Sequence, residues 1–203
     1  MKGETAMKYD EWFKGILAGL MISIGCTVFL SVGGIVGSIL FSVGLLGVVT
    51  YGLDLYTGKS GFLPIDANGF RKLFSILVFN SIGVIVSAYL MSRIHPEFSV
   101  KCTELIMGRV DSGLARVLVA SIGCGIMMSL AISGVKKNNY LPLLFAVPCF
   151  ILSGFYHSIA DLFYFMVSDV RVSNYIVVWI VTVIGNWIGC NVHRLIEQKP
   201  RTN

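Results

Sequence analysis

Long uncharged stretches separated by short polar segments dominate the chain. No charged residue occurs from Gly15 to Leu53, and four further uncharged runs cover Leu73–Ser92, Val117–Val135, Asn138–Ala160 and Val172–Val192. A helix of about 20 residues crosses the hydrocarbon core of a bilayer, so each shorter run is long enough for one span. The first run has room for two helices and contains Gly33-Gly34, which predicts a tight turn between them. The pattern therefore predicts six membrane spans.

The composition agrees with a membrane protein that has little mass outside the bilayer. Of the 203 residues, 55% are hydrophobic and only 13% are charged, whereas a soluble domain has about 25% charged residues. The first span is not a cleavable signal, because five more spans follow it. The net charge of +5 is spread out, so nucleic acid is not a predicted partner, but membrane lipid is. We predict a single transmembrane transport domain over residues 1–203.

The distribution of lysine and arginine predicts the orientation. With the N-terminus inside, eleven of these residues fall in the inner segments and five in the outer segments. An excess of positive charge marks the cytoplasmic side. We therefore expect a multi-pass protein of the cell (cytoplasmic) membrane with both termini in the cytoplasm.

The five cysteines do not predict a disulfide framework or a metal site. Four lie within predicted spans and Cys102 lies in a predicted loop, with no C-x-x-C and no Cys/His metal spacing. Core packing is the expected role of the four in spans, which are Cys26, Cys124, Cys149 and Cys190. No metal and no cofactor is predicted.

Three short patterns recur in the same order in both halves of the chain. The pairs are Ser23–Cys26 with Ser121–Cys124, Gly52–Thr57 with Gly154–Ile159, and Asn80–Gly83 with Asn186–Gly189. An odd number of spans per unit inverts the second copy, and inverted repeats commonly place a substrate site at the midplane on interrupted helices. We predict an inverted 3+3 repeat, with repeat one at about residues 12–93 and repeat two at about residues 112–196.

Two predicted spans contain signals of interruption. The second runs into Tyr51–Gly58, which holds two glycines and an aspartate, and the fifth contains Ser153-Gly154 midway. Non-helical backbone at membrane depth is tolerated only where it is buried in protein or lines a wet cavity. Helix N-termini at such breaks would direct free N–H groups at a passing anion. The alternative is a pair of glycine kinks that only improve packing.

His157 lies in the middle of the fifth span, with Asp161 one helical turn later. An ionisable side chain within the membrane is costly and is therefore a candidate functional site. A bare anion is costly to desolvate, and histidine is the side chain that exchanges a proton near physiological pH. We predict that His157 hydrogen-bonds a small anion and acts as a proton donor or relay. The alternative is a core histidine satisfied by a backbone carbonyl.

Three motifs of this chain resemble the formate–nitrite transporter family in combination. Gly154–Asp161 reads GFYHSIAD, Gly52–Thr57 reads GLDLYT, and Gly185–Gly189 reads GNWIG. In the family, the corresponding motifs are G-F-E-H-S-x-A-N, G-x-D/E-L-F-T and G-N-x-x-G. The resemblance extends from Gly15 to about Val192. It implies an all-α integral membrane protein with six transmembrane helices, in which helices 2 and 5 are interrupted, as in an aquaporin-like protomer.

The resemblance also implies a homopentamer in which each protomer has its own pore. Apolar rings narrow the pore on both sides of the central histidine. Carried over by position, one ring comprises Phe41, Leu45 and Phe150, and the other involves Leu55 and Tyr56. The family's loop threonine is Thr57. Without the resemblance, the three residues of the first ring would be interpreted as ordinary core.

The chain departs from the family pattern beside the histidine. Tyr156 stands where the family has glutamate, and Asp161 where it has asparagine. An aspartate facing the pore would repel anions, so we expect Asp161 to face the protein, where it either orients the imidazole or is structural. Asp54 is expected to cap free backbone N–H groups. The segment from Thr57 to Asn80 is also shorter than in typical members.

Cations near the span ends are candidates for collecting anions in the vestibules. Lys59 is the candidate on the inner side, and Lys101 or Arg109 on the outer side. The alternative is that they are topology charges only.

The predicted function is a channel or transporter for small monovalent weak-acid anions, with formate or nitrite first. Hydrosulfide, acetate and lactate are alternatives within the same class. A neutral small-solute channel is a second class, although the paired N-P-A motifs of such channels are absent. A non-transporting assembly protein is a third. An enzyme is not predicted, because the chain has no H-E-x-x-H, no G-x-S-x-G and no second histidine near mid-membrane.

Overall fold

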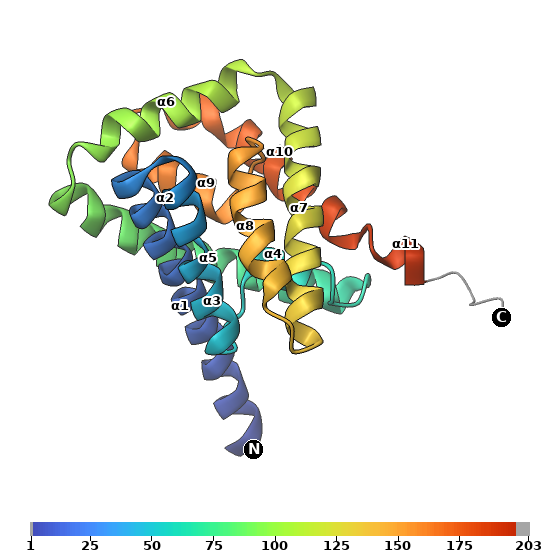
Figure 1. The fold of residues 1–203 in the computed structure, drawn as a ribbon. Coiled ribbons are helices and arrows are strands. Elements are labelled where there is room, and N and C mark those ends of the chain that lie inside the picture. Colours follow the sequence, from blue (N-terminus) through green and yellow to red (C-terminus); the bar gives the residue numbers. More distant parts are fainter. Residues whose placement is uncertain (1, 198–203) are drawn as a thin grey trace.

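The computed structural model describes residues 2–197, which form a bundle of helices (Figure 1). The helices in chain order are α1 (Lys2–Val32), α2 (Gly34–Leu40), α3 (Ser42–Thr50), α4 (Tyr56–Ser60), α5 (Ala67–Ile94), α6 (Phe98–Asp111), α7 (Leu114–Lys136), α8 (Leu141–Leu152), α9 (Ser158–Val167), α10 (Val172–Asn191) and α11 (Arg194–Glu197).

Four of these helices contain a continuous stretch that is long and apolar enough to cross a membrane. The stretches are Asp10–Val32 of α1, Ala67–Ile94, Leu114–Lys136 and Ser173–Asn191 of α10. The other two predicted spans are interrupted: α2 and α3 (together Gly34–Thr50) are followed by a break and by α4, and α8 is followed by a break and by α9. The multi-pass membrane architecture is therefore as predicted, with four continuous spans and two broken ones.

The predicted turn between the first two spans is present. Gly33 and Gly34 have φ angles of 69° and 56°, a left-handed conformation that glycine adopts without a Cβ penalty. The turn reverses the chain between α1 and α2, so that both helices lie side by side (Figure 1).

The two broken spans end their first halves in the same way. Gly52 after α3 and Gly154 after α8 have φ angles of 61° and 66°. In each break the next residue donates its backbone N–H back into the last turn, from Leu53 to Val48 at 2.9 Å and from Phe155 to Phe150 at 2.9 Å. This is the Schellman type of helix ending, with glycine at the left-handed position. The glycines therefore end the helices rather than only kinking them.

Asn80 of α5 holds the break in the second span. Its side-chain oxygen accepts the backbone N–H of Tyr56 at 2.8 Å, and its amide nitrogen donates to the carbonyls of Asp54 and Gly15, both at 2.8 Å. The side chain is fully buried. One amide thus pairs two backbone groups of the break, on Tyr56 and Asp54, and ties them to the Gly15 carbonyl of α1.

Asn186 of α10 holds the break in the fifth span by the same set of bonds. Its oxygen accepts the backbone N–H of Ser158 at 2.8 Å, and its nitrogen donates to the carbonyls of Tyr156 at 2.8 Å and Ser121 at 2.9 Å. In these contacts Tyr56 corresponds to Ser158, and Asp54 corresponds to Tyr156. These pairs, and that of Asn80 with Asn186, are the ones that the sequence patterns align.

The correspondence of the first helix of each half differs from the sequence prediction. The shared tetrapeptide aligned Ser23 with Ser121, but the asparagine contacts pair Gly15 with Ser121. Close packing agrees with the contacts: a Cβ on Gly19 would lie 2.2 Å from the Asn80 carbonyl oxygen, and one on Gly125 would lie 2.4 Å from the Asn186 carbonyl oxygen. The tetrapeptide match is therefore eight residues out of register with the packing.

Helix α6 was not predicted, because residues 94–113 were interpreted as an outer loop. It lies across one end of the bundle (Figure 1) and packs on α9. Phe98, Cys102 and Ile106 face the bundle and are buried. Their spacing of four residues is the helical signal that could have revealed it.

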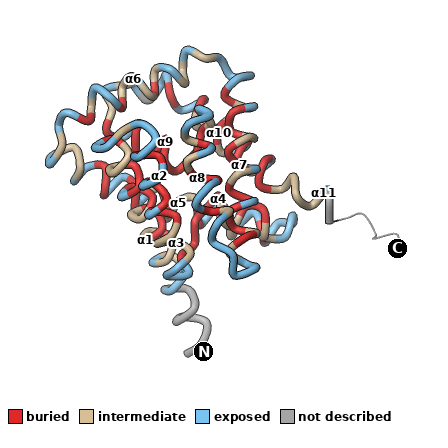
Figure 2. Tube along the Cα trace, in the orientation of Figure 1, coloured by how far each residue is buried: buried red, intermediate tan, exposed pale blue. Residues whose placement is uncertain are grey.

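Helix α9 lies at the centre of the molecule. Every residue from Ser158 to Tyr164 is buried, as the red tube around α9 shows (Figure 2). Apolar and aromatic residues occupy most positions of α9, which is typical of a buried helix, and its one charged residue, Asp161, is paired. The outer helices instead expose large apolar side chains, including Phe74, Val119 and Phe145.

Three of the four cysteines expected in the core are buried, but Cys149 is exposed. Cys149 lies on α8, and its face points away from the bundle. Cys102, expected in a loop, is buried in α6, where burial raises the pKa of its thiol to about 12. It is therefore protonated at neutral pH and unreactive.

Candidate functional site

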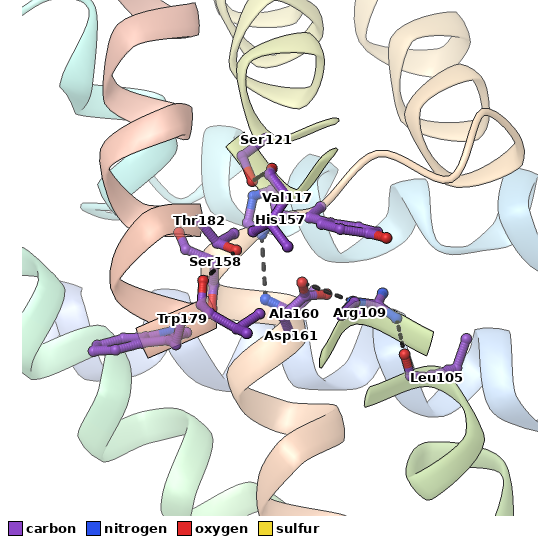
Figure 3. Close-up of polar contacts among 12 residues, drawn as sticks. Leu105, Arg109, Val117, Ser121, His157, Ser158, Ala160, Asp161, Trp179 and Thr182 are labelled. Atoms are coloured by element: carbon purple, nitrogen blue, oxygen red, sulfur yellow. Dashed lines mark hydrogen bonds and ion pairs between the residues drawn. The ribbon is translucent and has the colours of Figure 1, made fainter. Parts of the chain in front are cut away.

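His157 occupies the N-cap of α9, at the end of the break in the fifth span. Its side chain is 2% exposed. Its backbone is extended, and its Nδ1 accepts the backbone N–H of Ala160 at 3.2 Å (Figure 3). The residue therefore satisfies one of the N–H groups left free at the start of the helix. The bond is an N-cap made by an imidazole.

This bond determines where the proton of the neutral ring lies. A backbone N–H can only donate, so Nδ1 must be unprotonated and Nε2 carries the hydrogen. Nε2 lies 2.9 Å from the hydroxyl oxygen of Thr57, at the start of α4. His157 and Thr57, each predicted separately as a site residue, thus meet where the two interrupted spans come together.

The two aromatic residues of the first predicted ring, Phe41 and Phe150, lie beside the imidazole, and Phe150 is in direct contact with it. Phe150 stacks on His157 with ring centroids 5.7 Å apart, and Phe41 meets Phe150 edge-on at 6.0 Å. Phe41, Phe150 and His157 together line a cavity of about 120 Å³. Leu45 is buried one turn beyond Phe41 on α3 but does not line this cavity, so its place in the ring stays a prediction.

A second cavity, of about 370 Å³, is lined by residues that flank Thr57 in the sequence, including Gly58. Leu55 lines it, together with Val48, Leu53 and Ile132, and Lys59 lies at its polar wall. Leu55 and Lys59 thus line the same cavity, while the predicted roles of Leu55 in an apolar ring and of Lys59 in collecting anions stay predictions.

Tyr56 does not belong to either of these two cavities. Its hydroxyl donates to the Val183 carbonyl at 3.1 Å, and its ring lies among apolar side chains of α5 and α10. Residues 55 and 56 project to different sides of the short helix α4, so only Leu55 can line the path. We therefore remove Tyr56 from the predicted ring.

Asp54 does not cap the backbone, as had been expected, but pairs with Lys59. The ammonium nitrogen lies 2.8 Å from the carboxylate, and the lysine side chain is 40% exposed whereas the aspartate is 9% exposed. The ion pair holds Lys59 beside the cavity of about 370 Å³ and offsets part of the lysine's charge.

Asp161 likewise has a partner that differs from the expected one. It does not bond to the imidazole. Its carboxylate accepts the Nε–H of Arg109 at 2.8 Å, and the two side chains are 2% and 11% exposed (Figure 3). Arg109 comes from α6 and lines the cavity beside His157. The idea that Asp161 orients the histidine is wrong, because the N-cap bond to Ala160 does this instead.

Lys101, the other outer candidate, has a structural role. Its ammonium group donates to the Leu30 carbonyl at 2.9 Å, near the end of α1. Cations near the C-terminus of a helix stabilise its unpaired carbonyls and dipole. Lys101 does not line the cavity beside His157.

The asparagines at residues 80 and 186 are site residues that sequence reasoning used only as markers of a repeat. Each fixes the backbone on which Thr57 or His157 is mounted. Their signal was available, since a lone amide inside an uncharged span must find buried partners. Within the described residues, no group of three or more side chains is suited to hold a metal ion.

Comparison with known proteins agrees with this geometry. The formate/nitrite transporter family matches residues 3–194. The chain is 24% identical over 180 residues to the "Uncharacterized transporter YrhG" of Bacillus subtilis (strain 168), covering 73% of this chain and 67% of that protein.

Two solved structures share the fold. A structure described as an "FNT family ion channel" has a TM-score of 0.87 at 18% identity and covers 97% of this chain and 93% of its own. A "Pentameric formate channel with formate bound" has a TM-score of 0.84 at 21% identity, with 94% and 98% covered. Because the family match spans nearly the whole chain, this multi-pass membrane protein belongs to the formate/nitrite transporter family.

Proposed function

We propose that the protein conducts small monovalent weak-acid anions, formate or nitrite first, past the His157–Thr57 pair. The observation that carries the proposal is a hydrogen-bond donor that lines an apolar cavity and contacts Thr57, whose neighbours in the sequence line a second cavity. The Nε2–H of His157 is the only polar hydrogen that its ring offers, and Phe150 covers one ring face. Hydrosulfide, acetate and lactate are alternatives of the same class, and a neutral small solute is the alternative of another class.

The apolar constriction favours weak acids over permanently charged ions. Moving an isolated ion into apolar surroundings is very costly, whereas a neutral acid or a hydrogen-bonded anion crosses more cheaply. At the constriction, the Thr57 hydroxyl and the His157 N–H can replace part of the anion's water shell. An arriving anion can therefore take the place of the Thr57 hydroxyl as the acceptor of the Nε2–H hydrogen bond.

The N-cap bond limits how His157 can act as an acid. Loss of the Nε2 proton from the neutral ring would leave an imidazolate, so proton donation needs a ring that is first protonated on Nδ1. That step breaks the bond from Ala160. We propose that His157 acts as a hydrogen-bond donor while the bond is intact, and as a proton relay only when the ring releases Ala160.

The remaining features of the proposal concern the assembly and the vestibules. Lys59 attracts anions at the inner mouth, with both termini in the cytoplasm and the protein in the cell membrane. The similarity to a pentameric formate channel supports a homopentamer. The matching asparagine contacts support two inverted repeats, at about residues 12–93 and 112–196, in a single transport domain.

A flux assay in proteoliposomes tests the function. Purified protein is reconstituted, and uptake of formate, nitrite, hydrosulfide, acetate, lactate and a neutral solute such as glycerol is recorded at two pH values. We expect formate or nitrite to pass fastest and glycerol to stay at the level of empty liposomes. Glycerol flux without anion flux would favour the neutral-solute channel, and no flux of any kind would contradict transport.

A further inference from the structure

The proposed function leaves one group unexplained, namely the mostly buried guanidinium of Arg109. It lines the cavity of about 120 Å³ beside His157, which we call the outer cavity. It shares the cavity with His157, Tyr156 and Asp161. The sequence has no lysine or arginine at mid-membrane, and this cation reaches the histidine's cavity only because α6 folds back onto α9. The side chain is 11% exposed, so its charge has been largely removed from water.

Within the described residues, Arg109 uses only part of its hydrogen-bonding capacity. Its Nε–H donates to Asp161 at 2.8 Å, and Nη1 donates to the Leu105 carbonyl at 2.7 Å (Figure 3). A guanidinium has five N–H donors, so three remain, including both on Nη2. Nη2 makes no hydrogen bond to a described residue. It is also not one of the fully buried side-chain atoms that lack a hydrogen-bond partner, so part of its surface is exposed. It is therefore accessible from the cavity.

The remaining contacts hold the guanidinium in one place. Its central carbon lies 4.9 Å from the ring centroid of Tyr156 and 5.8 Å from that of Tyr164. Cation–π contacts and a carboxylate in a desolvated site restrict both the position and the plane of the fork. The free donors are thus oriented before a ligand arrives.

We propose that Arg109 forms an anion-binding site in the outer cavity, selective for small anions with two coplanar acceptor oxygens, such as formate or nitrite. The inference rests on the proposed function and assigns the site that an anion occupies before it reaches His157. A planar fork matches two oxygens and gives two charge-assisted hydrogen bonds. Hydrosulfide offers a single acceptor atom and gains less. The cavity of about 120 Å³ has room for such an anion, since one water in the liquid takes about 30 Å³.

Asp161 adjusts the strength of this site. An unpaired buried cation would hold an anion tightly, and conduction requires that a bound ion also leaves. The carboxylate cancels the net charge of the arginine, so the site recognises the anion by hydrogen-bond geometry more than by attraction. This explains an aspartate beside an anion path without requiring that it meet the anion.

Four variants test the inference through the half-saturation concentration for flux from the outer side. The double variant Arg109→Gln/Asp161→Asn removes both charges and leaves no unpaired buried ion. Arg109→Lys keeps the charge but loses the fork. Asp161→Asn leaves the arginine unpaired. Arg116→Gln is the matched control, because it removes an exposed arginine at the start of α7.

We expect the half-saturation concentration for formate and nitrite to rise about tenfold in the double variant, as for loss of one charge-assisted hydrogen bond. Arg109→Lys should raise it for these two anions while that for hydrosulfide stays near wild type. Asp161→Asn should lower both the half-saturation concentration and the maximal flux, because the anion is released more slowly. Arg116→Gln should match wild type.

The outcomes separate this inference from the proposed function. If wild type carries formate or nitrite but the double variant has the half-saturation concentration of Arg116→Gln, the arginine pair only joins α6 to α9 and the inference is overturned. If Arg109→Lys changes formate and hydrosulfide equally, the preference for two oxygens is overturned. If wild type carries none of the three anions, the proposed function fails and the inference with it.

Discussion

At the scale of single residues, His157 is held by two neighbours that determine its proton position. The Ala160 N–H fixes Nδ1 as an acceptor, and the Thr57 hydroxyl lies 2.9 Å from Nε2. A buried imidazole without these partners could adopt either tautomer or rotate. The two neighbours together make the Nε2–H of His157 the donor that the neutral ring presents.

Replacing Thr57 by valine should lower formate flux several-fold. Valine has nearly the same shape but no hydroxyl, so the imidazole hydrogen loses its partner and the constriction loses a polar group. Formate flux in proteoliposomes measures the effect. The control is Thr182→Val, which removes a buried hydroxyl that bonds only within α10. Equal fluxes in the two variants would show that Thr57 is not part of the path.

Replacing Phe41 or Phe150 by alanine should increase the flux of larger acids. Each change removes an aromatic ring from the cavity beside His157 and widens an apolar constriction without adding charge. Lactate flux relative to formate flux is the measurement. A ratio equal to that of wild type would count against a pore position for the substituted residue.

At the scale of elements, the two broken spans depend on one asparagine each. Each amide makes three hydrogen bonds with backbone groups near a break. Helix breaks inside a membrane are stable only when such groups are paired. The glycines end the helices, and the asparagines pair backbone groups that the breaks leave free.

Asn80→Ala and Asn186→Ala should each lower the free energy of unfolding by about 2–4 kcal/mol, because two buried backbone groups at each break lose their partner and the tie to the neighbouring helix is lost. Unfolding in mixed detergent micelles measures the loss. Asn174→Ala, at an exposed position on α10, should be close to wild type. If the buried and exposed variants are equally stable, the amides do not support the breaks.

The spans and breaks could be predicted because charge-free length and glycine position are local signals. The alignment of α1 with α7 was wrong, because it relied on a shared tetrapeptide. The close approach of Gly19 to α5, which shows the true alignment, is a tertiary contact that the sequence does not reveal. Helix α6 was missed because its apolar stripe is short and lies among charges. Local patterns therefore predicted which elements exist better than how they align.

In the site, His157 and Thr57 were each identified through the family motifs, but neither their contact nor the ion pairs were predicted. Asp161 and Arg109 are separated by 52 residues, and no local pattern identifies such a partner. Tyr56 was misplaced because neighbouring residues at the start of a short helix point in different directions. These contacts depend on tertiary packing.

At the scale of the whole molecule, the outer surface is apolar over most of the bundle. Phe74, Val119 and Phe145 are 68%, 69% and 73% exposed. Such a surface must be covered by lipid or by neighbouring subunits. The central helix α9 is by contrast buried from Ser158 to Tyr164.

We expect native mass spectrometry in mild detergent to show a homopentamer. The apolar outer surface supplies the contact area, and the similarity in fold to a pentameric channel gives the expected number of subunits. Monomers alone in several mild detergents would contradict this expectation.

The central claim is that anion passage depends on the imidazole of His157, and two substitutions of this residue test it most directly. Asparagine can still accept the Ala160 N–H at the N-cap and offers a donor, but it exchanges no proton near neutral pH. Phenylalanine removes the cap and the donor and leaves a continuous apolar plug.

The measurement is formate and nitrite flux into proteoliposomes, with internal pH recorded, for wild type, His157→Asn and His157→Phe. The account predicts residual flux without pH coupling for His157→Asn, and flux near background for His157→Phe, because an unpaired ion in an apolar passage is too costly. Wild-type flux and wild-type pH dependence in both variants would contradict it and leave His157 as a structural residue.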